Sequence, residues 1–261
     1  SVVNVNMSKL YDQPVATITE ALRGQVPGLS VQGGSQRPGA LPNLSIRQQF
    51  NWGKDGGNTI PLIIIDDVIQ LDPQTGLSTM DRFNLLDPTE VESITVLRDA
   101  SAAIYGYRAS QGAIIVKTKR GKAGPPRIRY TGKFETMDAV SHGKVMNAHE
   151  YGVYANRFGR ALDWNANFYF DSSELERMKS LNYDWLMNDW ERSGAMQHSL
   201  EVSGGSDKAT YFTGGSYYTQ SANLGSQDFN RYNFRAGTEV TVLSNVKFGA
   251  TIGAYRSNIE K

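Results

Sequence analysis

The second half of the chain alternates apolar and polar residues so regularly that it constrains the fold more than any other feature. Side chains of a β-strand point alternately to its two faces, so a period of two predicts a strand with one apolar and one polar face. Five stretches have this period, at residues 127–135, 196–204, 208–220, 231–242 and 246–255. In 231–242 one face carries Tyr232, Phe234, Ala236, Thr238, Val240 and Val242, and the other carries Arg231, Asn233, Arg235 and Glu239.

The connections between the five predicted strands differ in length. Tight turns at 204–208 and 243–245 join the second strand to the third and the fourth to the fifth, whereas a far longer stretch separates the first two. Outer-membrane barrels combine strands of about 9–11 residues with short periplasmic turns and long external loops. The pattern therefore favours membrane strands over a soluble sandwich. Five strands cannot close, because single-chain barrels begin at about eight, so we expect a fragment of a larger barrel.

The first part of the chain predicts a small α+β domain with long loops. The capping box Thr17–Glu20 predicts a helix at 17–24, and period-two or apolar runs predict strands at 29–32, 44–47, 61–68, 92–98 and 112–119. Asp87 followed by Pro88 predicts a helix start. The sequence GKAGPP at 121–126 is interpreted as a linker. We expect one domain over 1–122 and barrel strands over 123–261, with an external loop at about 137–195.

Two further helices are predicted within that loop. Asn147 is a candidate N-cap for a helix that reaches about residue 158. The sequence Ser173-Glu-Leu-Glu176 has the form of a second capping box, with a helix to about residue 181.

Composition and motifs argue against catalysis and against a bound cofactor or metal. The chain has no Cys, a net charge of +1 and three histidines, so neither a thiolate site nor a drive toward nucleic acid is indicated. His149-Glu150 begins like a zinc-protease motif, but Val153 stands where the second ligand would be. Asp66 and Asp67 are adjacent in the predicted 61–68 strand and would point to opposite faces. We therefore predict that the protein is not an enzyme.

Three stretches resemble a known family. Residues 86–121 read LDPTEVESITVLRDASAAIYGYRASQGAIIVKTKRG, residues 21–29 read ALRGQVPGL, and residues 61–68 read PLIIIDDV. They resemble the plug domain of TonB-dependent outer-membrane transporters, in the version of the SusC/RagA-type importers. Two positions depart from that pattern: Asp67 replaces the usual Gly, and Gln48 follows Arg47 where the family usually has Arg-Gly.

The resemblance implies a fold and a function. The fold would be an α+β plug domain followed by antiparallel strands of a transmembrane β-barrel of about 22 strands. The function would be TonB-dependent import of a nutrient, an oligosaccharide or, in the RagA-like branch, an oligopeptide. The partners would be a SusD-like surface lipoprotein, the TonB–ExbB–ExbD complex and outer-membrane lipid, with transporter–lid pairs forming dimers in the outer membrane. The alternatives are a surface receptor that binds or signals without transport, and a soluble β-rich secreted domain.

The candidate site residues fall in two groups. Trp52, Asp55 and Asn58 lie in a loop expected to face the substrate, because an indole stacks on sugar rings and the polar side chains hydrogen-bond. The second group has structural roles in the signature: small residues for close packing, glycines for tight turns, Tyr105 and Arg108 as anchors to the barrel, and Arg98 with Asp99 as an ion pair. Its members are Asp99, Ala100, Ser101, Tyr105, Gly106, Arg108 and Gly112.

Overall fold

The computed structural model describes residues 2–11, 15–34, 37–46, 60–141, 143–165, 168–181, 183–243 and 246–260, with the side chains of Ser8, Lys9, Asp99 and Trp185 outside the description. The chain divides into two compact units. The first comprises residues 1–136, 194–222 and 226–261, and the second comprises residues 137–193 and 223–225.

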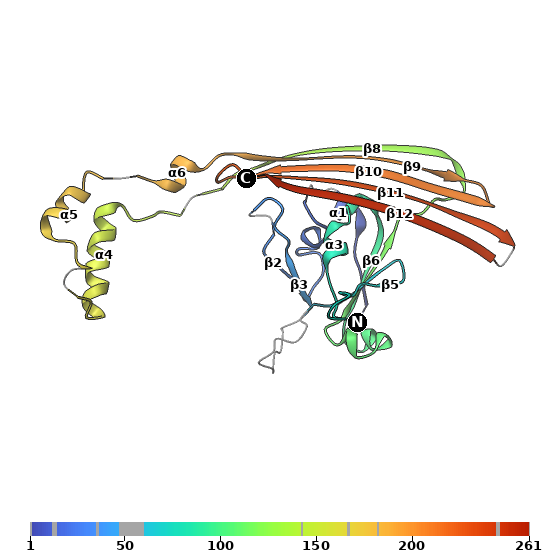
Figure 1. The fold of residues 1–261 in the computed structure, drawn as a ribbon, viewed down its shortest axis with the longest axis horizontal. Helices are drawn as coiled ribbons and strands as arrows, with labels where there is room; N and C mark the ends of the chain where they lie inside the picture. The colour runs from blue at the N-terminus through green and yellow to red at the C-terminus, as the bar shows by residue number, and fades with distance from the viewer. Residues whose placement is uncertain are drawn as a thin grey trace. The chain divides into compact units, whose positions relative to one another are not determined.

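The N-terminal part of the first unit is built on a mixed sheet (Figure 1). Its strand order is β1 (Val2–Asn4), β6 (Val91–Leu97), β7 (Ala113–Thr118), β4 (Leu62–Ile65) and β5 (Val68–Ile69). β4 and β7 pair in parallel, and the other pairs are antiparallel. A separate hairpin joins β2 (Leu29–Gln32) to β3 (Asn43–Ile46). The helices are α1 (Met7–Tyr11), α2 (Ile18–Ala21) and α3 (Asp81–Leu85).

The central strands of this sheet are buried on both faces. Ile63, Ile65 and Val116 belong to the larger apolar cluster, together with side chains of α2, α3 and the hairpin. Leu62 and Ile64 point to the opposite face and join a second, smaller cluster. A strand covered on both sides needs apolar residues at consecutive positions. This explains why the apolar runs in the first part of the chain are continuous, whereas those of the second part alternate.

The strand predicted at 61–68 is interrupted, and this prediction was wrong. β4 ends at Ile65, and Asp66 and Asp67 have φ angles of 48° and 68° before β5 begins at Val68. A two-residue hairpin turn needs positive φ at both positions, and Asp is among the few residues that tolerate it. The two carboxylates therefore belong to a tight turn. The predicted helix at 17–24 is also shorter, since α2 ends at Ala21, although Thr17 caps it as expected.

The turns of the 86–121 segment depend on a capping carboxylate and on glycine. Asp87 caps the 3₁₀ helix η1 (Pro88–Glu90), and β6 follows at once. Two further 3₁₀ helices, η2 (Asp99–Tyr105) and η3 (Tyr107–Ala109), are separated by Gly106 at φ 73° and ψ −161°. That conformation is essentially restricted to glycine.

Gly112 combines positive φ with a lack of space. Its φ is 89°, and a Cβ atom there would lie 2.9 Å from Ile46 Cδ1 and 3.0 Å from the Leu97 carbonyl oxygen. Gly112→Ala is therefore expected to destabilise the domain by about 2 kcal/mol, from backbone strain and overpacking together. Gly76→Ala is the matched control, because Gly76 has φ 66° but open space around it. Urea denaturation of both variants measures the difference, and equal losses would contradict the packing contribution.

The C-terminal part of the first unit is an antiparallel sheet of long strands (Figure 1). Its order is β12 (Val246–Glu260), β11 (Asp228–Leu243), β10 (Ala209–Ser221), β9 (Ser193–Gly205) and β8 (Gly124–Met137). All five predicted strands are confirmed, and each extends beyond its predicted bounds at one or both ends. β8 begins at Gly124, inside the segment 121–126 that was interpreted as a linker, because its two prolines lie at the start of the outermost strand, where fewer backbone N–H groups need a partner.

Burial of this sheet is opposite to that of a water-soluble protein. The side that faces the N-terminal domain is polar, and Gln197 and Arg231 are each only 1% exposed. The other side is apolar and open, with Tyr232 52% and Phe234 49% exposed. A soluble sheet would cover its aromatic residues and leave arginine in water. The apolar face therefore requires an apolar environment.

The second unit contains α4 (Ala148–Ala161), α5 (Ser172–Met178) and α6 (Trp185–Asp189). Asn147 caps α4 in a complete capping box, as predicted. The cap of α5 is Asp171, paired with Glu174. The box predicted at Ser173–Glu176 was wrong, because Asp171 lies two residues earlier and its carboxylate already accepts from the Glu174 N–H.

None of the helices in the described ranges combines the length and the apolar character needed to cross a membrane.

Candidate functional site at the interface of the two sheets

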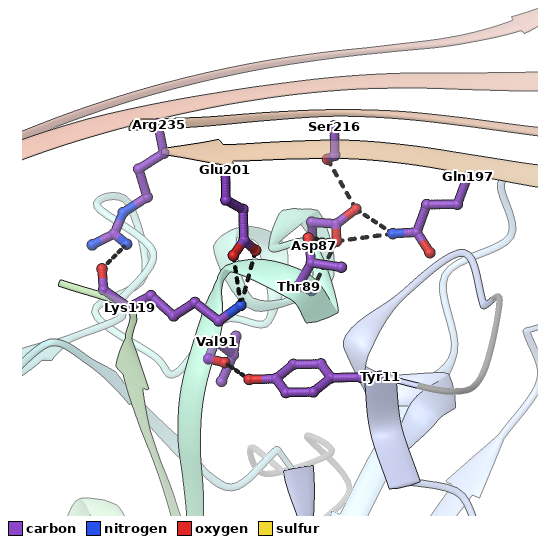
Figure 2. A network of polar contacts seen from close by, with 9 residues as sticks. All are labelled: Tyr11, Asp87, Thr89, Val91, Lys119, Gln197, Glu201, Ser216 and Arg235. Atoms are coloured by element: carbon purple, nitrogen blue, oxygen red, sulfur yellow. Dashed lines mark hydrogen bonds and ion pairs between the residues drawn. The ribbon is translucent and has the colours of Figure 1, made fainter. Parts of the chain in front are cut away.

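The N-terminal domain is held against strands β9, β10 and β11 through one buried carboxylate. Asp87 has no exposed surface, and its oxygens accept from Gln197 Nε2 at 2.9 and 2.8 Å, from Ser216 Oγ at 2.9 Å and from Arg231 Nη2 at 3.1 Å. Its own Thr89 adds a backbone donor at 2.9 Å and a hydroxyl at 2.6 Å. We call these five residues the Asp87 network (Figure 2, which draws all but Arg231).

Local structure positions Asp87 for this contact. The residue is the N-cap of η1, so its side chain is already turned toward the start of the helix and toward Thr89. On the strands, Gln197, Ser216 and Arg231 stand on the polar face of β9, β10 and β11. The sheet order places these strands side by side, so their inward side chains converge on one point. Arg231 also donates through Nη1 to the Ala16 carbonyl, which adds the segment before α2 to the same attachment.

The charge of Asp87 is stabilised by its partners. Burial acts to raise the pKa of Asp87, but the Arg231 guanidinium and the hydrogen bonds from Thr89 and Ser216 outweigh it and hold the pKa below its ordinary value. Breaking a buried pair by removing one partner typically costs 3–5 kcal/mol, about as much as a large core truncation. Removing either Asp87 or Arg231 alone is therefore expected to weaken the contact between the two sheets.

Arg235 lies on the same face of β11 as Arg231 and makes a second attachment. Its Nη1 donates to the Lys119 carbonyl at 3.0 Å, and its Nη2 lies 3.2 Å from Asp66 Oδ2 and also contacts the Thr118 hydroxyl. Asp66 can reach this point because it lies in the β4–β5 turn, where its Oδ1 accepts from the Thr118 N–H at 2.9 Å. The tight turn thus supplies a functional carboxylate.

Lys119 makes the third attachment. Its Nζ lies 2.8 and 3.0 Å from the two carboxylate oxygens of Glu201 on β9, and 4.9 Å from the centre of the Tyr11 ring (Figure 2). The Tyr11 hydroxyl donates to the Val91 carbonyl, and burial followed by the Glu201 charge raises the pKa of Tyr11 to about 12. Arg120 pairs with Glu239, and Lys122 pairs with Glu92.

A cavity of about 560 Å³ lies beside these attachments. Asp66, Glu90 and Arg235 line it together with residues of β10, β11 and β12. Glu90 is 6% exposed, and its Oε1 has no hydrogen-bond partner. In the part of the chain that the structure describes, no three His, Asp or Glu side chains lie close enough to hold a metal ion.

The site residues predicted from the sequence are not among those of the three attachments. Trp52, Asp55 and Asn58 fall in residues 47–59, outside the described residues. The side chain of Asp99 is also outside the description. Tyr105 packs against the smaller apolar cluster of its own domain, and the Arg108 guanidinium lies 5.8 Å from the ring centre of the neighbouring Tyr107. Ser101 Oγ donates to the Arg98 carbonyl at 2.5 Å, whereas Ala100 is exposed.

The residues that bridge the two sheets were recognised only in part. Asp87 was predicted as a cap, and Arg231 and Arg235 were predicted on the polar face of a strand, but their pairing was not. One signal could have indicated it. An arginine on the inner face of a membrane strand must meet a carboxylate or a carbonyl, because an unpaired charge there is too costly.

Known proteins that are similar to this chain agree with the resemblance found in its sequence. A family model described as the TonB-dependent receptor plug domain matches residues 1–113. Residues 1–113 therefore belong to the plug-domain family of the TonB-dependent receptors. It is 28% identical to the TonB-dependent receptor SusC of Bacteroides thetaiotaomicron over 236 residues, which cover 89% of this chain and 22% of SusC. It is 26% identical to the TonB-dependent receptor P3 of Formosa agariphila, covering 98% of the chain and 23% of that relative.

Solved structures agree with the predicted fold class. The RagAB peptide importer in its closed-closed state matches the whole chain with a TM-score of 0.76 and 26% identity, over 31% of the RagAB chain. The chain spans less than a quarter of the length of SusC and of P3. An α+β plug followed by antiparallel strands of a membrane barrel is confirmed, and TonB-dependent receptors are outer-membrane proteins. We therefore call the N-terminal domain the plug and strands β8–β12 the wall.

Proposed function

We propose that this receptor imports a nutrient across the outer membrane, with an oligosaccharide as substrate and a SusD-like lipoprotein as its surface partner. The plug fills the barrel lumen, and energy from the TonB–ExbB–ExbD complex moves it. The role is transport rather than catalysis. The observation that carries the proposal is the reversed burial of the wall, whose polar face holds the plug while its aromatic face is open.

The interface suits a plug that must be held and also moved. Three separate attachments, centred on Asp87, Asp66 and Lys119, join the plug to the wall through polar groups rather than through a continuous apolar core. Polar contacts can be exchanged for water when the plug shifts, and the domain can then open in steps. An apolar interface of the same size would instead expose a large surface at once.

The substrate class is supported by resemblance. The resemblance of the 86–121 signature to the SusC-type importers favours an oligosaccharide. The likeness to a structure named as a peptide importer makes an oligopeptide the second candidate. The resemblance of the signature to the SusC/RagA-type importers supports the lipoprotein lid and the dimer of transporter–lid pairs.

Native mass spectrometry tests the proposal. The tagged receptor is extracted from outer membranes in mild detergent, and the masses of its bound partners are measured. A particle that carries a lipoprotein and a glycan is the expected result, whereas a bound peptide would select the second candidate. A receptor with neither partner nor ligand, in cells whose growth on glycans and peptides is unchanged by its deletion, would contradict import.

A further inference from the structure

Glu90 is a buried carboxyl group of the plug–wall interface that stands outside the ion pairs of the three attachments. The ion pairs of the three attachments are one to one: Asp87 with Arg231 at 3.1 Å, Asp66 with Arg235 at 3.2 Å, and Glu201 with Lys119 at 2.8 Å. Glu90 is the fourth carboxyl, and among the described residues it forms no ion pair. Because a buried charge without a counter-charge is costly, a group in this position is better accommodated in its neutral form.

Hydrogen bonding at Glu90 also calls for a proton. Glu90 Oε1 is buried without a partner, and so is Oδ1 of Asn233 on the adjoining strand β11. The Asn233 amide is oriented by its Nδ2, which donates to the Leu85 carbonyl at 2.7 Å, so its oxygen remains an acceptor. Asn233 hydrogen-bonds the Glu90 carboxyl and favours its charged form, but Oε1 of that carboxyl has no donor. A carboxylate leaves this buried acceptor unsatisfied, whereas protonation at Oε1 turns it into a donor and lowers that cost.

The cavity gives protons access to this group. Glu90 lines it, and the cavity is roomy and polar enough to admit water. Charged groups approach Glu90 or the cavity from every neighbouring element: Asp87 of its own turn, Arg82 of α3, Asp66 after β4, Lys119 and Arg120 after β7, and Arg231, Arg235 and Glu239 of β11.

We propose that Glu90 is a proton-binding site of the seated plug, and that loss of this proton weakens the attachment of the plug to the wall. Glu90 hydrogen-bonds Asn233 of β11, so a change in its charge acts directly on the contact between the plug and the wall. The proposal depends on the interface alone and is independent of which nutrient is imported.

The pKa of Glu90 is shifted in the direction that the proposal requires. Burial, followed by the Asp87 charge, raises the pKa of Glu90 from its ordinary 4.5 to about 7, against the opposing effects of Arg235, Arg231 and Asn233. The seated plug therefore binds the proton more tightly than the displaced plug. Attachment is strongest below the ordinary pKa, falls as pH rises from 4.5 to about 7, and is constant above that.

Hydrogen exchange of the receptor in outer-membrane extracts tests this. Exchange of β4, β6 and β7 amides, corrected for the intrinsic effect of pH, should be on the order of 10-fold faster at about pH 8.5 than at about pH 5.5. Glu90→Gln keeps the shape without the titration, so its corrected rates should stay at the low-pH level. Glu92→Gln is the matched control, because Glu92 is two residues away but exposed and paired with Lys122.

Infrared difference spectroscopy gives a second readout that needs no stability change. The carboxylic-acid C=O band should be present at the lower pH and absent at the higher one in the wild type, and missing throughout in Glu90→Gln. A flat corrected exchange profile in the wild type would overturn the proposal even if Glu90→Gln failed to fold. So would a Glu90 carboxyl that is ionised at both pH values.

Discussion

Asp87→Ala is expected to weaken the seating of the plug by about 3–5 kcal/mol, the largest effect of any single substitution at the interface. The alanine leaves the Arg231 guanidinium buried at 1% exposure without a counter-charge, and it removes the acceptor for Gln197 and Ser216. Urea denaturation followed by exchange of the plug amides should show the plug opening at lower urea while the barrel stays folded. Asp81→Ala is the control, since Asp81 is an exposed carboxylate on α3.

A double substitution shows how much of the loss comes from the attraction between Asp87 and Arg231, and how much comes from leaving Arg231 buried without a counter-charge. If the loss in Asp87→Ala comes mainly from stranding Arg231, then Asp87→Leu combined with Arg231→Met should recover much of it, because both charges are then absent. Loss of the Ala16 contact sets a limit to the recovery. A double variant as unstable as the sum of its single variants would show that the two residues act independently, and the Asp87 network would then not be one attachment.

If the receptor imports a nutrient as proposed, Asp87→Ala should loosen the plug, which then needs less force to move but also leaks. Permeability of the outer membrane, measured beside uptake, is therefore the readout for this variant. The Asp87 pKa is held low by its partners, so the attachment is present above the ordinary pKa and is lost as pH falls through the lowered value. Glu90 acts in the opposite direction and at higher pH.

The sequence predicts periodicity well and partners poorly, for a physical reason. Alternation reports which side of a strand a residue occupies, so the apolar face with Tyr232 and Phe234 and the polar face with Arg231 and Arg235 were both correct. It does not report what covers that face. Asp87 and Arg231 are 144 positions apart, and no local pattern joins them.

Turn chemistry shows a second limit. Asp66 and Asp67 read as the end of a strand, because the run before them is apolar and the usual glycine of the family is absent. The structure puts both at positive φ, and Asp66 then reaches Thr118 and Arg235. Local propensity allows either arrangement, and in the structure the chain turns back at Asp66 and Asp67 so that β5 pairs with β4.

Arginine on the open face of the wall gives the second large prediction. Phe234→Arg is expected to cost about 2–4 kcal/mol in the folded barrel if the residue lies near the middle of the bilayer, because the guanidinium would be moved into lipid. Heat-modifiable migration of outer-membrane fractions on a gel measures the folded share. Phe234→Leu is the control that keeps an apolar side chain, and we expect it to fold like the wild type.

An arginine scan along β11 makes the test independent of any one position. Tyr232, Phe234, Ala236 and Val240 alternate along the same face, so their depths in the bilayer differ. The cost of arginine falls to about 0–1 kcal/mol near the membrane surface. The loss should therefore peak at one or two of these positions and decline on both sides. If water covered this face, arginine would be tolerated equally at all four, because none of them would then have to leave an aqueous environment.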